Sequence, residues 1–166
     1  MVRVRYAITI VVIVTFGGIA ILCSPPGEEG KVKKQFHLLS EWVSKDDGEK
    51  LLTTVRKVRN IGTLFARECV LKAHIDSYSG TYTPEEISEH AATARSRFSN
   101  VSLRFYNFNI DFPEEGRARV AVTARLTGLS TTGERVDDAH ELGCLLKRAE
   151  DTWLFTQVVM VEVLRK

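Results

Sequence analysis

An aspartate and a histidine two residues apart are the pair in this sequence best suited to acid–base chemistry. They are Asp138 and His140, in the segment VDDAHELGCLL. Alternate residues of an extended strand point to the same face, so both side chains lie on the side of the apolar Leu142 and Cys144. A carboxylate and an imidazole held in an apolar pocket can transfer a proton near neutral pH. The alternative is structural: a half-buried histidine bonded to a neighbour, beside a solvated carboxylate near a turn.

A second group of polar side chains lies in the segment HIDSYSGTYTPEEI. Its members are His74, Asp76, Tyr78 and Tyr82. A tyrosine ring is amphipathic and can contact a ligand at the mouth of a pocket, although it can equally well pack a loop. We interpret these four residues as a candidate ligand-binding rim, separate from the candidate catalytic pair.

The end of the same segment predicts the start of a helix. Thr83 can cap it, Pro84 suits the first helical position, and Glu86 completes a capping box three residues after the threonine. The helical period then separates an apolar stripe from a polar one. We expect Ile87, Ala91, Ala94 and Phe98 to face the core, and Glu85, Glu89, Arg95 and Arg97 to face water.

Two more helices and one strand precede this segment. Apolar residues recur at helical spacing in residues 31–45 and again from residue 51, and Gly62 ends the second run. Residues 63–75 alternate apolar and polar positions, which predicts a strand. The apolar residues of the second run are Leu51, Leu52, Val55, Val58 and Ile61.

The chain from Val101 onward predicts four long strands in an antiparallel meander. Short turns at PEEG, STTGER and AED separate them. Residues 117–127 alternate cleanly, so one face of the sheet is apolar. The apolar parity changes near Phe105, which predicts a β-bulge that bends the sheet. The fold class is therefore α+β: three N-terminal helices on a bent, mainly antiparallel sheet that forms a cone or half-barrel.

The amino terminus predicts a membrane segment. Residues 6–23 form an uncharged apolar run of 18 residues, enough as a helix to cross about 27 Å of hydrocarbon. We interpret it as an uncleaved signal anchor, with a cleaved signal or a lipidated Cys23 as the alternatives. Arg3 and Arg5 precede it, which predicts a folded domain outside the cytoplasm, in a periplasm or its equivalent. The predicted organisation is an anchor in residues 1–24, a linker in residues 25–30 and a folded domain in residues 31–166.

Charge and cysteine content narrow the classes of function. The formal charge of +2 equals the contribution of Arg3 and Arg5, so the folded domain is neutral and we expect no nucleic-acid partner. The histidines are scattered and no cysteine spacing matches a zinc site, so we expect no metal and no cofactor. Cys69 and Cys144 fall among alternating apolar positions, which predicts two small buried residues. A disulfide between them is the alternative if the domain is exported.

The order of the predicted elements resembles the nuclear transport factor 2-like superfamily, which includes ketosteroid isomerases and small polyketide cyclases. Many of these domains open the third helix with a Gly-x-x-[ST]-x-E-E-[IL] signature, matched here by Gly80, Thr83, Glu85, Glu86 and Ile87. The resemblance covers residues 31–166. It implies a cone-shaped fold with a pocket at its wide end and, in many members, a homodimer through the sheet. Enzymes and non-enzymatic proteins share this fold, so it does not fix the function.

Three functions follow as hypotheses. The first is a membrane-anchored, outward-facing binding module for a small apolar molecule or a protein partner. The second is a scaffold subunit of an envelope complex, because the same fold on one N-terminal span resembles subunits of secretion machines. The third is an isomerase, dehydratase or cyclase that uses Asp138 and His140. No candidate residue aligns with a catalytic set of the resembled isomerases and cyclases, so binding is favoured over catalysis.

Overall fold

Three helices and six strands make up the part of the chain that the structure, a computed structural model, describes: residues 27–73 and 79–161. The helices are α2 (Glu28–Val43), α3 (Leu51–Thr63) and α4 (Pro84–Ser96). The strands are β1 (Phe65–Lys72), β2 (Gly80–Tyr82), β3 (Phe98–Glu114), β4 (Arg117–Ser130), β5 (Arg135–Ala149) and β6 (Thr152–Val161). All three helices predicted for the folded domain are present. The sequence did not predict β2, because three residues are too few to show a period of two.

The start of α4 has the predicted capping box. The backbone N–H of Glu86 donates to the side-chain oxygen of Thr83 at 3.3 Å, and the backbone N–H of Thr83 donates to the Glu86 carboxylate at 2.8 Å. Pro84 occupies the first turn, where its missing N–H costs no hydrogen bond. The segment after Gly80 is therefore explained by helix initiation.

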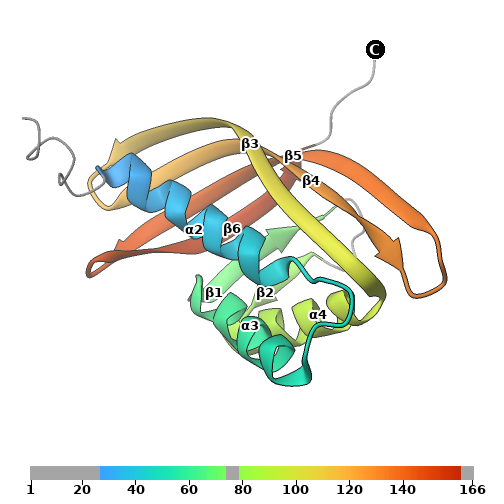
Figure 1. Cartoon of the computed structure of the whole chain (residues 1–166). Helices are drawn as coiled ribbons and strands as arrows, with labels where there is room; N and C mark the ends of the chain where they lie inside the picture. Colours follow the sequence, from blue (N-terminus) through green and yellow to red (C-terminus); the bar gives the residue numbers. More distant parts are fainter. Residues whose placement is uncertain (1–26, 74–78, 162–166) are drawn as a thin grey trace, which may run out of the picture.

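The six strands form one curved sheet in the order β2-β1-β6-β5-β4-β3 (Figure 1). Consecutive strands from β3 to β6 pair antiparallel with one another, as predicted. β1 pairs parallel to β6, which makes the sheet mixed. Figure 1 shows α2 lying across the sheet, with α3 and α4 side by side next to β1 and β2.

The predicted β-bulge is present in β3, slightly later than expected. The register between β3 and β4 shifts between Tyr106 and Asn109. Asn107 lies at the shift with a φ of 56°, a left-handed conformation that asparagine tolerates better than most residues. The shift moves the apolar parity, so Phe105 and Phe108 both face the core.

The core lies between α2 and the concave face of the sheet. Phe36 of α2 is 1% exposed and meets the edges of three rings, those of Phe105, Phe108 and Phe155. Its ring centroid lies 5.2, 5.3 and 4.9 Å from theirs, close to perpendicular in each case. Edge-to-face packing of this kind stabilises aromatic pairs beyond the area they bury. The aromatic rings thus fill the space between α2 and the middle of the sheet.

β3 is an edge strand of the sheet, and groups at the end of α2 and in the loop after it bind to its free edge. Lys45 and Val101 exchange backbone hydrogen bonds of 2.8 and 2.9 Å across this edge. The hydroxyl of Ser40 donates to the carbonyl of Leu103, and the N–H of Leu103 donates to the hydroxyl of Ser44. These contacts satisfy edge groups that would otherwise be open to pairing with another strand.

The structure corrects the predicted orientation of Arg95. Its side chain is 3% exposed and does not face water. The guanidinium donates to the carboxylate of Glu49 at 2.8 Å and to the carbonyls of Val43 and Ser44 at 3.0 and 3.1 Å. Lys57 also pairs with Glu49, at 2.6 Å. A loop carboxylate therefore holds two cations between the helices.

The predicted second helix is present as α3, but its apolar residues face solvent in the first half of the helix. Leu51, Leu52 and Val55 are 76%, 85% and 52% exposed, whereas Ile61 is 2% exposed. The buried residues of α3 are Ile61 and Gly62, so only its C-terminal end enters the core.

Cys69 and Cys144 are buried free thiols, as the first interpretation predicted. They lie on β1 and β5, which are separated by β6. Strands two places apart are about 10 Å apart, beyond the 7 Å or so that a disulfide can bridge. Burial raises the pKa of the two thiols, to about 11 for Cys69 and about 12 for Cys144. The alternative prediction, a disulfide between Cys69 and Cys144, is therefore wrong.

The predicted membrane segment, residues 6–23, lies outside the described residues. Among the helices that the structure describes, none has the length and apolar character needed to span a bilayer.

Candidate functional site

The structure brings Asp138 and His140 together on β5. The Nε2 atom of His140 lies 2.8 Å from the Oδ2 atom of Asp138. His140 pairs in register with Ala124 of β4, and Asp138 with Leu126. Both residues therefore share the sheet face that carries the buried Cys144, as strand alternation predicted.

This pair is more exposed than a typical proton-transfer site. The side chain of Asp138 is 63% exposed and that of His140 is 37% exposed. Neither residue lines the hollow where the loop after α2 meets β3, β4 and β5, or the groove between α3 and α4. Solvent of high dielectric weakens the electrostatic interactions on which acid–base catalysis depends. The geometry thus places an imidazole and a carboxylate in hydrogen-bond contact, with both side chains open to solvent.

The candidate rim is described only in part. His74, Asp76 and Tyr78 lie outside the described residues. Tyr82 is half-buried in β2, and its ring meets the ring of His90 edge-on, with centroids 5.1 Å apart. Tyr82 thus packs β2 against α4, which is the structural role weighed for it from the sequence.

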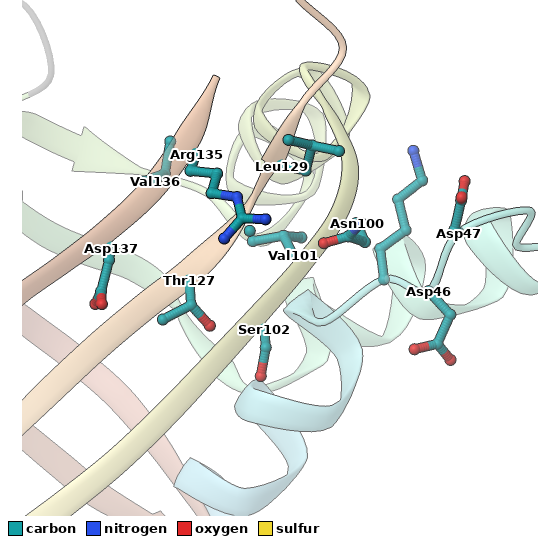
Figure 2. Close-up of a pocket in the computed structure, with 12 residues that line it drawn as sticks. Asp46, Asp47, Asn100, Val101, Ser102, Thr127, Leu129, Arg135, Val136 and Asp137 are labelled. Carbon is teal, nitrogen blue, oxygen red and sulfur yellow. The ribbon is translucent and has the colours of Figure 1, made fainter. Parts of the chain in front are cut away.

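The sequence did not predict the polar hollow shown in Figure 2. It is an open cavity of about 710 Å³ where the loop after α2 meets β3, β4 and β5. Four short segments line it: residues 45–47, 100–102, 127–129 and 135–137. We refer to these twelve residues as the polar hollow. Because its four segments are far apart in the chain, no local motif marks it.

Opposite charges lie on different sides of the polar hollow. Arg135 extends from β5 toward Asn100 and Val101, whereas Asp46 and Asp47 lie on the loop after α2 (Figure 2). In the described part of the chain, no ion pair engages Arg135. An arginine without a carboxylate partner retains its full set of donors for an anionic group.

The remaining charges of the polar hollow are held by the protein itself. Arg125 donates to both carboxylate oxygens of Asp137, at 2.8 and 2.7 Å. These hydrogen bonds hold the pKa of Asp137 below its usual value, against an opposing effect of burial. Lys45 donates from its Nζ atom to the carbonyl of Phe98 at 2.7 Å. Arg135 and the two loop aspartates are therefore the charges most available to a ligand.

Comparison with known proteins identifies the fold. No family model and no curated protein matches the sequence. The structure is similar to a protein assigned as an aromatic ring hydroxylase from Novosphingobium aromaticivorans, with a TM-score of 0.67 and 15% identity over 86% of this chain and 93% of that one. It is similar to a protein assigned as a scytalone dehydratase from the same organism, with a TM-score of 0.64 and 16% identity over 82% and 85% of the two chains. A hexachlorocyclohexane dehydrochlorinase, LinA type 2, gives a TM-score of 0.64 and 11% identity over 80% and 83%.

These likenesses establish the class of fold. The three helices and the curved, mixed six-stranded sheet form the α+β cone of nuclear transport factor 2-like proteins. At such low identity the similarity concerns the fold alone, and the same fold carries many unrelated functions. The function must therefore be argued from the residues of this chain.

Proposed function

We propose that the chain is a membrane-anchored binding module whose folded domain lies outside the cytoplasm. Residues 6–23 serve as the anchor, and the polar hollow holds a small zwitterion or a peptide segment. The observation that carries the proposal is the placement of Arg135 on one side of the hollow and of Asp46 and Asp47 on another. A ligand with a carboxylate and an amine meets a complementary charge at each end.

Two further features support binding at this surface. The volume of about 710 Å³ falls in the range of ligand pockets. The rings around Phe36 pack between α2 and the middle of the sheet, and the hollow beside them measures about 270 Å³, much smaller than the polar hollow. A polar ligand at the open hollow is thus better supported than an apolar one under α2.

Calorimetric titration of the full-length chain in detergent with zwitterionic dipeptides tests this proposal. Arg135→Gln should weaken binding about tenfold or more, because a hydrogen bond to a charged group contributes about 1.5–3 kcal/mol. Arg119→Gln is the matched control, since Arg119 is exposed on β4 outside the hollow. Equal affinity in both variants, or no binding by the wild type, would contradict the proposal.

Acid–base catalysis is a second candidate, favoured by the 2.8 Å contact between His140 and Asp138. The chain would then act as an isomerase, dehydratase or cyclase. Exchange of the α-protons of a cyclic ketone into deuterated water, followed by NMR, measures this activity. His140→Gln should slow the exchange about 100-fold or more. Glu141→Gln, on the opposite sheet face, should not change it, and a wild-type rate equal to that of buffer would eliminate this candidate.

An assembly role is a third candidate, favoured by large apolar side chains on the outer face of the sheet. Tyr106, Leu145 and Val161 are 39%, 37% and 42% exposed. A photocrosslinker at position 145 of the membrane-bound chain should give one recurrent adduct, of twice the chain mass if the partner is a second copy. Recovery of uncrosslinked monomer alone would count against both the scaffold and the homodimer.

A further inference from the structure

The first half of α3 presents an apolar surface to solvent. Leu51, Leu52 and Val55 are at least half exposed there, and Val58 continues the surface into a groove. This groove lies between α3 and α4 and has a volume of about 540 Å³. Three large exposed apolar residues on one helix form a continuous patch, which in soluble proteins marks a contact surface.

Basic side chains border the same patch. At about 100° per residue, Arg56 and Arg59 fall within about 140° of Leu51 on the helix surface, on the side that also carries Val55. Both arginines are exposed. No acidic residue occurs between residues 51 and 63. We call Leu51, Leu52, Val55, Arg56 and Arg59 the α3 face.

Within the described part of the chain, no acidic residue forms an ion pair with Arg56 or Arg59. Asp46 and Asp47, on the loop before α3, line the polar hollow. Glu49 is turned inward, where it binds Lys57 and Arg95 and is 5% exposed. Glu85 lines the groove at the start of α4. That end of α4 contacts the far end of α3, because an added Cβ at Gly62 would lie 2.5 Å from the carbonyl oxygen of Pro84. Glu85 shares this groove with Val55 and Arg59, whereas Leu51, Leu52 and Arg56 do not line it.

We propose that the α3 face lies in the headgroup region of a membrane that contains anionic lipid. The leucines and the valine enter the boundary with the acyl chains, and the arginines extend to the lipid phosphates, as in interfacial amphipathic helices. The α3 face contains two arginines and no acidic residue. Its charge therefore favours an anionic lipid surface over an apolar groove on another protein.

This inference rests on the proposed anchor for its geometry. Only four residues separate Cys23 from Glu28 at the start of α2, so the five Cα–Cα steps reach at most about 17 Å when extended. A domain tethered so closely meets the bilayer surface repeatedly, so even a weak interfacial contact becomes well populated.

A fluorescent probe on the α3 face of the full-length chain tests the inference. Leu52→Cys in a Cys23→Ser background is labelled with an environment-sensitive dye and reconstituted into phosphatidylcholine vesicles, with or without phosphatidylglycerol. Brominated lipids report insertion, and aqueous iodide reports exposure. The control carries the dye at Ala121→Cys, an exposed site on the outer face of β4. The buried thiols of Cys69 and Cys144 should resist labelling.

The expected result is quenching of the position-52 probe by brominated lipid only when phosphatidylglycerol is present, with reversal by salt. Arg56→Gln together with Arg59→Gln should weaken the contact about 30-fold, since each basic residue near an anionic surface contributes about 1 kcal/mol. A probe at position 52 that iodide quenches equally in both kinds of vesicle would overturn the inference. Protection that rises with protein concentration in lipid-free detergent would also overturn it, because the face would then join two copies.

Carbonate extraction of the reconstituted chain separates this inference from the anchor. Release by carbonate would contradict the anchor, and the position-52 probe would still report contact of the added chain with anionic vesicles. Retention by carbonate with a water-exposed probe would leave the anchor in place and remove the α3 contact.

Discussion

Glu49 is the ionisable residue most tightly bound into the fold. Its burial tends to raise the pKa of the carboxyl, but hydrogen bonds from Lys57, Arg95 and Thr54 outweigh burial and lower the pKa from 4.5 to about 2. The carboxylate lies in the loop between α2 and α3 and reaches α4 through Arg95. One loop side chain thus joins α3 and α4 electrostatically.

Replacing this carboxylate should destabilise the protein strongly. We expect Glu49→Gln to lower the free energy of unfolding by about 3–5 kcal/mol, because Arg95 is left buried without its counter-charge. Urea denaturation followed by circular dichroism measures the change. Glu41→Gln, an exposed position on α2, is the control and should shift the midpoint little. Similar midpoints for the two variants would show that Arg95 finds other partners.

The same carboxylate predicts how stability depends on pH. Because its pKa is lower in the folded chain than the ordinary 4.5, its contribution is complete above pH 4.5 and declines as the pH falls toward 2. The difference in unfolding free energy between the wild type and Glu49→Gln should shrink over that interval. A difference that stays constant down to pH 2 would contradict the assignment.

Sequence patterns at the residue scale found the Asp138–His140 contact but missed the burial of Arg95. Strand alternation is a local rule, and it places residues i and i+2 on one face whatever the tertiary structure. The environment of Arg95 depends on Glu49, which lies 46 residues away in the chain. Helical periodicity carries no information about such a partner, so arginine defaults to the solvent face.

At the scale of elements, β3 and β4 approach each other closely at Gly128. This glycine pairs in register with Val101. An added Cβ would lie 2.5 Å from the carbonyl oxygen of Asn100 and 3.1 Å from the Cα atom of Val101. Both are backbone atoms, so relief requires the strands to separate.

Gly128→Ala should therefore destabilise the sheet where it borders the polar hollow. We expect a loss of about 1–3 kcal/mol, the usual result of forcing atoms into a filled site. Gly143→Ala is the matched control, because its Cβ would meet only a side-chain carbon of Val161, at 3.9 Å. Thermal melts of both variants provide the comparison. An equal melting temperature for the two would show that the strands separate at little cost.

Helix and strand positions were largely predictable, but helix orientation was not. The capping box at Thr83 and the alternation in β4 are local and appear unchanged in the structure. For α3, the apolar period correctly predicted a helix. It could not show that the first turns extend beyond the core, because exposed leucines on such a surface have the same period as buried ones.

At the scale of the whole molecule, Phe36 joins α2 to the sheet. Its ring contacts aromatic residues from both β3 and β6. These strands lie three places apart in the sheet order. The packing of one side chain therefore sets the separation between the helix and the concave face.

Phe36→Ala should open an apolar cavity at this centre. We expect the free energy of unfolding to fall by about 3–5 kcal/mol. The cavity should also bind small apolar molecules such as benzene, as dry apolar cavities do, and binding should raise the melting temperature of the variant but not of the wild type. Phe112→Ala, at a 40% exposed ring, is the control and should gain no such site. Stabilisation of both variants by benzene would point to another binding site.

The cone fold could be predicted from the order of elements, whereas the polar hollow could not. The hollow combines four segments that are separated by up to about 90 residues of chain. Its members are ordinary residues of turns and strands, eight of them polar or charged, and only the fold brings them together.

The separation of the two buried thiols by β6 makes the fold independent of redox conditions. Because Cys69 and Cys144 do not cross-link, oxidants and reductants in the surrounding compartment have no bond to form or break within the described core. Folding of the described core therefore requires neither an oxidising compartment nor an oxidising enzyme.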